Sequence, residues 1–266
     1  MSHYLLEVKD LNCRFEIERN LFSKNKYLHV LKNINFNLKQ GSTLGIVGES
    51  GCGKSTLCRT ILSLNNKETG NIKWFSKDID QFSKKEFKNF RKKVQIIFQD
   101  PYGSLNPRMT IGNIISEPLE IYKKENDKKS KTLKVLDVME KVGLSDLLFN
   151  RFPHELSGGQ CQRVGIARSI INEPDVLICD EPVSSLDLSV QSQILDLLKS
   201  LKNKLNITMV FVSHDLAVVK SISDEVMVLK QGVMVEKSSA EQVFNKPKDE
   251  YTKKLISSVP RINNIE

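Results

Sequence analysis

A nine-residue stretch, residues 48–56, constrains the fold of this chain more than any other feature. It reads Gly-Glu-Ser-Gly-Cys-Gly-Lys-Ser-Thr and matches the pattern GxxxxGK[ST]. An apolar run, Thr43–Val47, precedes it, and a helical pattern, Ser55–Leu64, follows it. This order of strand, glycine-rich turn and helix is typical of a phosphate-binding loop, because glycines let successive N–H groups face one anion and the helix N-terminus adds positive charge. The sequence therefore predicts a site for nucleotide phosphates.

Two side chains of this loop have predicted chemical roles. Lys54 reaches the β- and γ-phosphates of a bound nucleotide, and the Ser55 hydroxyl is a ligand for Mg²⁺. The whole loop is predicted to line the nucleotide: Gly48, Glu49, Ser50, Gly51, Cys52, Gly53, Lys54, Ser55 and Thr56.

A second stretch, residues 175–181, reads Asp-Val-Leu-Ile-Cys-Asp-Glu and predicts a buried strand that ends in two acids. Open α/β sheets place their ligand chemistry at such strand ends. Asp180 is predicted to hold Mg²⁺, mainly through a coordinated water. Because successive strand residues point to opposite faces, Glu181 does not compete for the metal and is predicted to act as general base on the attacking water.

The fold class follows from short apolar strands that alternate with helical patterns, which indicates an α/β core with a parallel sheet wrapped by helices. Between residues 99 and about 155 we find helical patterns, including a helix over Thr132–Val142, and no convincing strand. We interpret that stretch as a helical insertion. The predicted strands are Thr43–Val47, Val94–Phe98, Asp175–Cys179, Thr208–Val212 and Glu225–Lys230.

Composition narrows the location and the partners of the chain. Its 266 residues contain no apolar run near the ~20 residues of a membrane helix, so we expect the chain to remain in the cytosol. The net charge of +8 permits nucleic acid as a partner, but lysines in stretches such as Lys84–Lys93 are mixed with acids on an amphipathic helical pattern, and no nucleic acid is expected. Five irregularly spaced cysteines predict reduced thiols.

A third motif, Leu-Ser-Gly-Gly-Gln at residues 156–160, is followed by CQRVGIAR. Its serine and glycines open a helical pattern, which predicts a second anion-binding helix terminus. The pentapeptide resembles the signature of ABC ATPases. The resemblance implies that these residues act in trans, covering the γ-phosphate held by a second subunit, so that two subunits enclose two ATP molecules: Ser157, Gly158, Gly159 and Gln160.

Other elements of that family occur in the expected order. Gln99, in IIFQDP, resembles the Q-loop glutamine, which faces Mg²⁺ and water. Asp187, in SSLD, resembles the D-loop residue that crosses the dimer interface, and His214, in VFVSHD, resembles the switch histidine. The resemblance thus implies a catalytic set of Glu181, His214, Gln99 and Lys54, and a Mg²⁺ set of Ser55, Gln99 and Asp180.

The aromatic side chain that stacks on adenine has two candidates. Phe15, in LNCRF, is the first choice, and a phenylalanine stacks as the family's usual tyrosine does. Tyr27 is the rival, because the stretch between the two residues is longer than in many relatives.

The resemblance also implies an architecture, namely a P-loop NTPase (RecA-like) core with the antiparallel β and helical subdomains of ABC ATPases. We expect a single ABC ATPase domain over residues 1–266. Within it, residues 100–155 are expected to form the inserted helical subdomain, and residues 236–266 a family-specific C-terminal tail.

Three longer stretches resemble the ATPases of oligopeptide and dipeptide importers, in particular their F-type member. They are QDPYGSLNPRMTIG at 99–112, FPHELSGGQ at 152–160 and EYTKKLISSVP at 250–260. Importers of nickel, glutathione and other small solutes share much of this pattern, and an exporter's ATPase, a soluble nucleic-acid-associated ABC ATPase and a regulatory module without turnover stay open as alternatives.

The partners that the resemblance implies are a second ABC ATPase subunit (a D-type paralogue or a second copy), two integral-membrane permease subunits and, indirectly, an extracytoplasmic solute-binding protein. The expected location is the cytoplasmic face of the cell membrane.

Overall fold

The computed structural model describes residues 4–18, 26–122 and 127–258, and the chain divides into two compact units. Unit 1 comprises Met1–Ser83 and Val210–Glu266, and unit 2 comprises Lys84–Met209. The chain passes from unit 2 into unit 1 within strand β8, Thr208–Val212. Each unit is described separately below.

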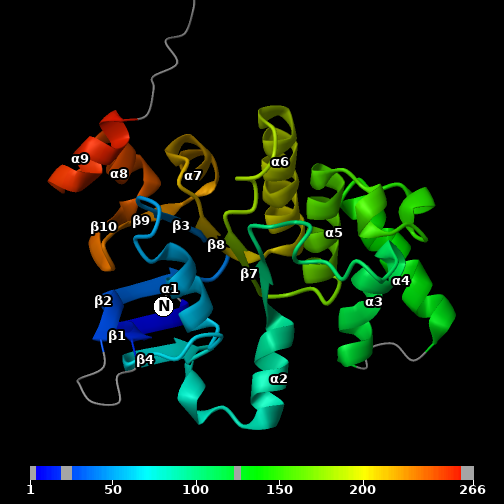
Figure 1. Ribbon diagram of the computed structural model, residues 1–266, viewed down its shortest axis with the longest axis horizontal. Coiled ribbons are helices and arrows are strands. Elements are labelled where there is room, and N and C mark those ends of the chain that lie inside the picture. The colour runs from blue at the N-terminus through cyan, green and yellow to red at the C-terminus, as the bar shows by residue number, and fades with distance from the viewer. Residues whose placement is uncertain (1–3, 19–25, 123–126, 259–266) are drawn as a thin grey trace, which may run out of the picture. The chain divides into compact units, whose positions relative to one another are not determined.

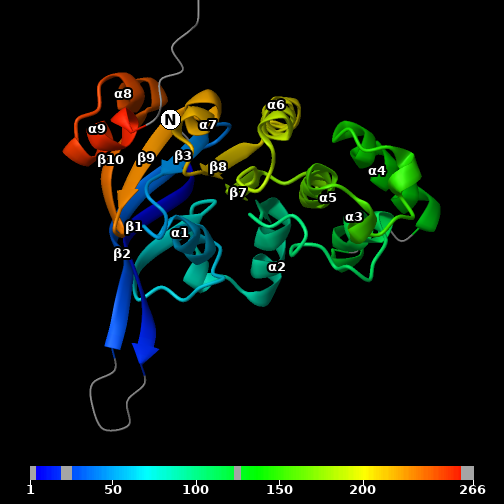
Figure 2. The same cartoon turned by 45° about the horizontal axis from the view of Figure 1, so that its top comes forward.

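Unit 1 contains an antiparallel sheet in the order β2-β1-β4-β5 (Figure 1). Its strands are β1 (Tyr4–Glu18), β2 (Lys26–Lys39), β4 (Thr69–Trp74) and β5 (Lys77–Asp78). Val8 of β1 lies opposite Phe36 of β2 and Ile72 of β4, and all three are buried. These alternating apolar positions form one covered face of the sheet. Figure 2 shows the β1–β2 hairpin extending beyond the sheet.

Trp74, the only tryptophan of the chain, anchors this sheet to helix α1 (Lys54–Ile61). Its side chain is fully buried, and its indole Nε1 donates a hydrogen bond of 2.8 Å to the carbonyl oxygen of Ile61. That carbonyl belongs to the last turn of the helix, where the helix backbone supplies no N–H donor for it. The indole therefore packs against the C-terminal end of α1 and donates the hydrogen bond that the Ile61 carbonyl oxygen would otherwise lack.

Replacing Trp74 with phenylalanine should lower the free energy of unfolding by about 2–4 kcal/mol, because it leaves a buried carbonyl unsatisfied and a void beside it. Urea unfolding followed by far-UV circular dichroism measures this change without relying on tryptophan fluorescence. Leu147→Ala, at a side chain that is 82% exposed, is the control and should change stability by less than about 0.5 kcal/mol. A loss at Trp74 no larger than the control's would contradict the anchoring role.

The second set of strands in unit 1 carries the phosphate loop. The wholly buried strand β3 (Thr43–Val47) pairs in parallel with β9 (Glu225–Lys230), which pairs antiparallel with β10 (Val233–Ser239). A run of five apolar or small residues suits a strand that is covered on both faces. The helices of unit 1 other than α1 are α7 (Leu216–Ile222), α8 (Ala240–Asn245) and α9 (Glu250–Ser257).

Glu236, on β10, holds the chain where it enters α9. Its carboxylate accepts hydrogen bonds from the backbone N–H groups of Lys248, at 3.0 and 3.2 Å, and of Asp249, at 3.1 Å. Burial of Glu236 raises its pKa, but these donated hydrogen bonds outweigh it and hold the pKa below the ordinary 4.5. The side chain is therefore ionised at neutral pH.

This lowered pKa predicts a pH-dependent contribution to stability. Because the folded state binds the Glu236 proton less tightly than the unfolded chain, the contribution is complete above pH 4.5 and is lost as the pH falls through the folded pKa. Unfolding free energies of the wild type and of Glu236→Gln, measured from neutral pH down to about pH 3, should therefore converge at the acidic end. A difference between the two proteins that stays constant with pH would contradict this assignment.

Unit 2 combines two parallel strands with a group of helices. β6 (Val94–Ile97) pairs in parallel with β7 (Val176–Asp180), with Ile97 opposite Cys179. Helix α3 contacts both α4 and α5, and the green helices in Figure 1 show this group. The helices of unit 2 are α2 (Lys84–Lys93), α3 (Ile111–Ile121), α4 (Lys128–Lys141), α5 (Gly158–Ile170) and α6 (Leu188–Leu205).

The five strands predicted from the sequence are confirmed, with shifts of one residue in two of them. Phe98 lies just beyond β6, and β7 is displaced by one residue, so that it begins at Val176 and includes Asp180. The predicted helices correspond to α1, α2 and α4, and α4 is followed by Gly143 in the left-handed region, at φ 70°. Between 100 and 155 the described residues form α3, α4 and two short 3₁₀ turns and contain no strand, as expected.

All five cysteines lie in described residues, where each is buried and free, which confirms the prediction of reduced thiols. No helix in the described ranges combines the length and the apolar character that crossing a bilayer requires.

Candidate nucleotide site

In unit 1 the phosphate loop curls around the ammonium group of Lys54. This side chain is only 4% exposed, and its Nζ donates hydrogen bonds to the carbonyl oxygens of Gly48, at 2.8 Å, and Glu49, at 2.9 Å. The Cys52 Sγ, a weak acceptor, lies 3.9 Å away as a third partner, so the ammonium is held at the inner wall of the loop, and a phosphate oxygen can replace the sulfur as acceptor. A cation held in place within a glycine-rich loop at the start of a helix suits a polyphosphate.

The phosphate loop packs closely against the backbones of β2 and β9. Gly53, at φ 109°, ends the loop, and a Cβ there would lie 2.9 Å from the carbonyl oxygen of Val30 on β2. At Gly48 a Cβ would lie 2.2 Å from the carbonyl oxygen of Leu229 on β9. Real Cβ atoms do not approach backbone so closely, so both positions require glycine. The loop is therefore pressed between β2 and β9.

The other residues of the loop differ in their exposure to solvent. Glu49, Ser50 and Gly51 are exposed, whereas Cys52 is buried, with its Sγ 3.9 Å from the Nζ of Lys54. Burial raises the pKa of the Cys52 thiol in spite of the nearby ammonium, so the thiol is protonated at neutral pH. A neutral Cys52 adds no negative charge that would oppose an incoming phosphate.

His214 lies at the same edge of unit 1 as the phosphate loop. The N–H of Ser213 donates a hydrogen bond of 3.3 Å to the carbonyl oxygen of Ile46, close to the end of β3 that leads into the loop. Asp215 then caps α7 by accepting hydrogen bonds from the N–H groups of Ala217 and Val218. The exposed His214 is thus fixed between a paired strand end and a capped helix.

The two candidates for adenine stacking lie on opposite faces of the β1–β2 hairpin. Phe15 pairs with Leu28, whereas Tyr27 pairs with the next residue of β1, Glu16, and packs under the guanidinium of Arg14 at 4.4 Å. Successive strand residues point to opposite faces. Phe15 is two residues beyond Cys13, which faces α1 through a contact of 3.8 Å with the Thr60 hydroxyl. A register irregularity between Cys13 and Arg14 separates the two residues, so strand alternation does not carry the orientation of Cys13 on to Phe15.

Unit 2 contains the predicted carboxylates. Asp180 ends β7 and is 3% exposed. Glu181 has a left-handed backbone, at φ 50°, which is uncommon for any residue except glycine. Strand alternation, on which the sequence argument relied, therefore does not separate these two acids. The chain leaves the strand at Asp180, and the turn itself redirects Glu181.

A hydrogen bond joins Gln99 to Glu181 although the two residues are far apart in the sequence. The amide Nε2 of Gln99, just after β6, donates to the Glu181 Oε2 at 3.1 Å. The Ser185 hydroxyl contacts the Gln99 carbonyl oxygen at 3.5 Å, and the Ser184 hydroxyl donates to the Glu181 carbonyl oxygen at 3.1 Å. The parallel pairing of β6 with β7 brings these groups together at one edge.

The signature residues open helix α5 with a capping box. The Ser157 hydroxyl accepts from the N–H of Gln160 at 3.3 Å, and the Gln160 side-chain oxygen accepts from the N–H of Ser157 at 2.9 Å. This reciprocal arrangement fixes the first turn of the helix. A Cβ at Gly158 would meet only ordinary contacts, at 3.6 Å or more, so the packing of unit 2 does not require glycine there. The helix start is thus both fixed and accessible.

Gly159 brings the signature and the D-loop segment together. A Cβ at Gly159 would lie 2.6 Å from the Val190 Cγ1 in the first turn of α6, so any larger residue would require the Val190 side chain to shift. Asp187 is the exposed N-cap residue of α6. The structure thus joins the signature to the D-loop helix, and Gln99 to Glu181, within unit 2, as it joins the loop, Lys54 and His214 within unit 1.

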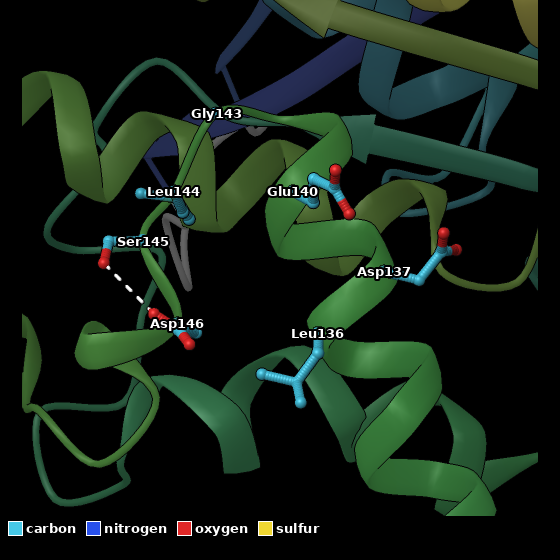
Figure 3. A pocket seen from close by; sticks show the side chains of 7 residues that line it. All are labelled: Leu136, Asp137, Glu140, Gly143, Leu144, Ser145 and Asp146. Atoms are coloured by element: carbon cyan, nitrogen blue, oxygen red, sulfur yellow. Dashed lines mark hydrogen bonds between the residues drawn. The ribbon is translucent and has the colours of Figure 1, made fainter.

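A separate hollow of about 680 Å³ lies between the end of α4 and the following turn (Figure 3). Leu136 and Leu144 form its apolar part, and the carboxyl groups of Asp137, Glu140 and Asp146 stand around it. None of the described residues that line it belongs to the predicted nucleotide site, and three carboxylates would repel a polyphosphate. This hollow is therefore not a second nucleotide pocket.

The polar groups predicted for Mg²⁺ fit that ion in kind. They are a hydroxyl, an amide and a carboxylate, from Ser55, Gln99 and Asp180, and hard oxygen ligands of this type suit Mg²⁺. Among the residues described, no cluster of three or more His, Cys, Asp or Glu side chains could bind a metal by itself.

One contact at the phosphate loop is absent from the sequence predictions. The phenol oxygen of Tyr251, on α9, accepts a hydrogen bond of 3.2 Å from the N–H of Glu49. In the sequence, the segment containing Tyr251 indicates only a resemblance to a transporter family, because no local pattern signals a contact across 202 residues.

Comparison with known proteins gives consistent results. The profile of the ABC transporter family matches residues 31–184. The chain is 51% identical over 259 residues to the oligopeptide transport ATP-binding protein OppF of Haemophilus influenzae, covering 96% of this chain and 78% of that protein. It is 44% identical to the dipeptide transport ATP-binding protein DppF of Escherichia coli, covering 97% of this chain and 77% of that protein.

Solved structures of similar fold include two ATP-binding cassettes. One is the dimeric post-hydrolysis state of the cassette MJ0796 bound to ADP and Pi, with a TM-score of 0.78, 27% identity and coverage of 88% of this chain and 98% of that chain. The other is cbiO1 from Clostridium perfringens, part of the cbiONQ transporter complex, with a TM-score of 0.77, 31% identity and coverage of 97% of both chains.

Proposed function

Because the chain belongs to the ABC transporter family of ATP-binding proteins, we propose that it is the ATP-hydrolysing subunit of an importer of oligopeptides or dipeptides. The observation that carries the cargo class is the 51% identity to an oligopeptide transport ATP-binding protein over nearly the whole chain. The P-loop NTPase fold expected from the sequence is that of the solved cassettes. The chain therefore binds and hydrolyses ATP.

Each of the predicted site residues has a separate role in ATP hydrolysis. The loop of residues 48–56 and the ammonium of Lys54 bind the phosphates, since Lys54 is already fixed by two loop carbonyls. Glu181, held by the amide of Gln99, accepts a proton from the attacking water. His214 contacts the γ-phosphate, and Phe15 stacks on the adenine.

Mg²⁺ is proposed to be held by Ser55, Gln99 and Asp180. When bound, it supplies positive charge next to the phosphate oxygens that gain negative charge during the reaction. The buried Asp180 keeps its carboxylate at the end of β7, where oxygen ligands are needed.

The signature residues 157–160 and Asp187 are proposed to act on the nucleotide of a second ATPase subunit. The accessible start of α5 supports this proposal, because its capping box fixes the helix terminus without covering it. The helix N-terminus then presents N–H groups and partial positive charge to a γ-phosphate bound elsewhere. The second subunit is a D-type paralogue or a second copy of this chain.

The remaining partners are two integral-membrane permease subunits and, indirectly, an extracytoplasmic solute-binding protein, which places the chain at the cytoplasmic face of the cell membrane. We further propose that residues 1–266 form one ABC ATPase domain. Its helical subdomain spans residues 100–155, where the described residues form only helices and turns, and its C-terminal tail spans residues 236–266.

The test is to purify the chain with its membrane partners, reconstitute the complex in vesicles and measure phosphate release. A solute-binding protein loaded with a short peptide should stimulate hydrolysis several-fold, whereas the same protein without peptide is the control. Stimulation by nickel or glutathione with no response to peptides would overturn the cargo class. A complex that never hydrolyses ATP would overturn the motor itself.

A further inference from the structure

The contact between Tyr251 and the phosphate loop involves a single peptide group. The N–H of Glu49 donates to the Tyr251 phenol oxygen at 3.2 Å. The carbonyl of the same peptide group, that of Gly48, accepts the hydrogen bond of 2.8 Å from the Nζ of Lys54. A peptide group is planar and trans, so its N–H and C=O point in opposite directions. The group is therefore held between Tyr251 on one side and Lys54 on the other.

The helix that carries Tyr251 is itself held firmly in unit 1. Asp249 caps α9 by accepting a hydrogen bond of 2.8 Å from the N–H of Tyr251, and the Glu236 carboxylate binds the two preceding backbone N–H groups. The Tyr251 side chain is 8% exposed, and the ammonium of Lys230 lies 5.0 Å from the centre of its ring. The phenol thus reaches the loop from a fixed support.

The phenol is also in the correct protonation state to accept this hydrogen bond without carrying charge. Burial raises the pKa of Tyr251, the Glu49 amide acts against this, and the charge of the Glu49 carboxylate raises the pKa further. A neutral hydroxyl beside the loop leaves Lys54 as the positive charge that faces the phosphates.

From this geometry we propose that Tyr251 is a positioning residue for ATP binding, which orients the Gly48–Glu49 peptide group and through it the ammonium of Lys54. The C-terminal helix α9 then sets the affinity of the phosphate loop, and its release from unit 1 weakens nucleotide binding. The inference rests on the proposed function, because Lys54 must bind ATP for its orientation to matter.

The first test is Tyr251→Phe in the full chain, which removes one oxygen atom and keeps the ring. We expect the KM for ATP, and the Kd measured with a fluorescent ATP analogue, to rise about 3- to 10-fold, the usual effect of losing one hydrogen bond. The effect on KM should exceed that on kcat. Tyr122→Phe, at a half-buried tyrosine of unit 2, is the matched control and should leave both constants unchanged.

A second measurement reports on the contact directly. Hydrogen exchange at the backbone N–H of Glu49 should be about 3- to 10-fold faster in Tyr251→Phe than in the wild type, because the N–H loses its acceptor. Glu236→Gln, which weakens the support of α9, should raise the KM in the same direction. If both changes act through one helix, the double variant should show less than the product of the two single effects.

The outcomes separate this inference from the proposed function. Wild-type KM and wild-type exchange at Glu49 in Tyr251→Phe, with ATP still bound, overturn the positioning role and leave the ATPase assignment intact. Fully multiplicative effects of Tyr251→Phe and Glu236→Gln overturn the part assigned to α9. A wild-type chain that binds no ATP overturns the proposed function instead.

Discussion

Substituting Glu181 with glutamine is expected to leave ATP binding nearly unchanged while hydrolysis falls by at least about 100-fold. The amide has the shape of the carboxylate and keeps an oxygen that can accept from Gln99, which lies 3.1 Å from Glu181. It has no basic oxygen for the proton of the attacking water. Because ATP stays bound, the variant should accumulate in the closed, dimeric state.

Two measurements check this expectation: phosphate release under saturating ATP, and size-exclusion chromatography with and without Mg·ATP. Glu140→Gln, at an exposed carboxylate of the same unit, serves as the control and should hydrolyse ATP at the wild-type rate. Turnover by Glu181→Gln close to that of the control would defeat the role of general base.

Removing the Lys54 side chain should have the largest effect on ATP binding itself. Lys54→Ala deletes the cation that meets the phosphates and leaves the carbonyls of Gly48 and Glu49 without their donor. Hydrogen bonds from a charged donor contribute about 1.5–3 kcal/mol each, so we expect affinity to fall by about 100-fold or more. The wider guanidinium of Lys54→Arg should not restore it, because the Lys54 side chain is only 4% exposed and the loop is packed around a compact ammonium.

Titration with a fluorescent ATP analogue measures this loss. Lys129→Ala removes an exposed lysine of α4 and should bind ATP as the wild type does, which controls for the change in net charge. Far-UV circular dichroism of Lys54→Ala confirms that the chain is folded. Affinity within about threefold of the wild type, in a folded variant, would be incompatible with the phosphate-binding role.

The sequence predicts local and strongly apolar elements best. The runs at Thr43–Val47 and Thr208–Val212 became β3 and β8 with the same bounds, because buried parallel strands need continuous apolar residues. The antiparallel strands β1 and β2 were expected only through the family resemblance. Their alternation is interrupted by register shifts, one of them near Asp10, whose backbone is left-handed at φ 50°.

In the candidate site, too, features set by neighbouring residues can be predicted from the sequence, whereas contacts between distant residues cannot. The capping box of Ser157 and Gln160 follows the pattern S-x-x-Q, and this local signal was available in the sequence. The left-handed turn at Glu181 has no such signal, because a strongly apolar strand gives no indication of where its backbone leaves the β region. The contacts of Gln99 with Glu181 and of Tyr251 with Glu49 join residues that are 82 and 202 positions apart, so only the folded chain reveals them.

The close approach of Gly159 to Val190 has a mechanical consequence. Because a Cβ at Gly159 would displace the Val190 side chain, the start of α5 and the first turn of α6 are in close contact, and we expect a displacement of one to push on the other. In the proposed pair of ATPase subunits, a subunit that contacts one of these segments is therefore expected to move the other as well, so that the signature and Asp187 act as one contact surface.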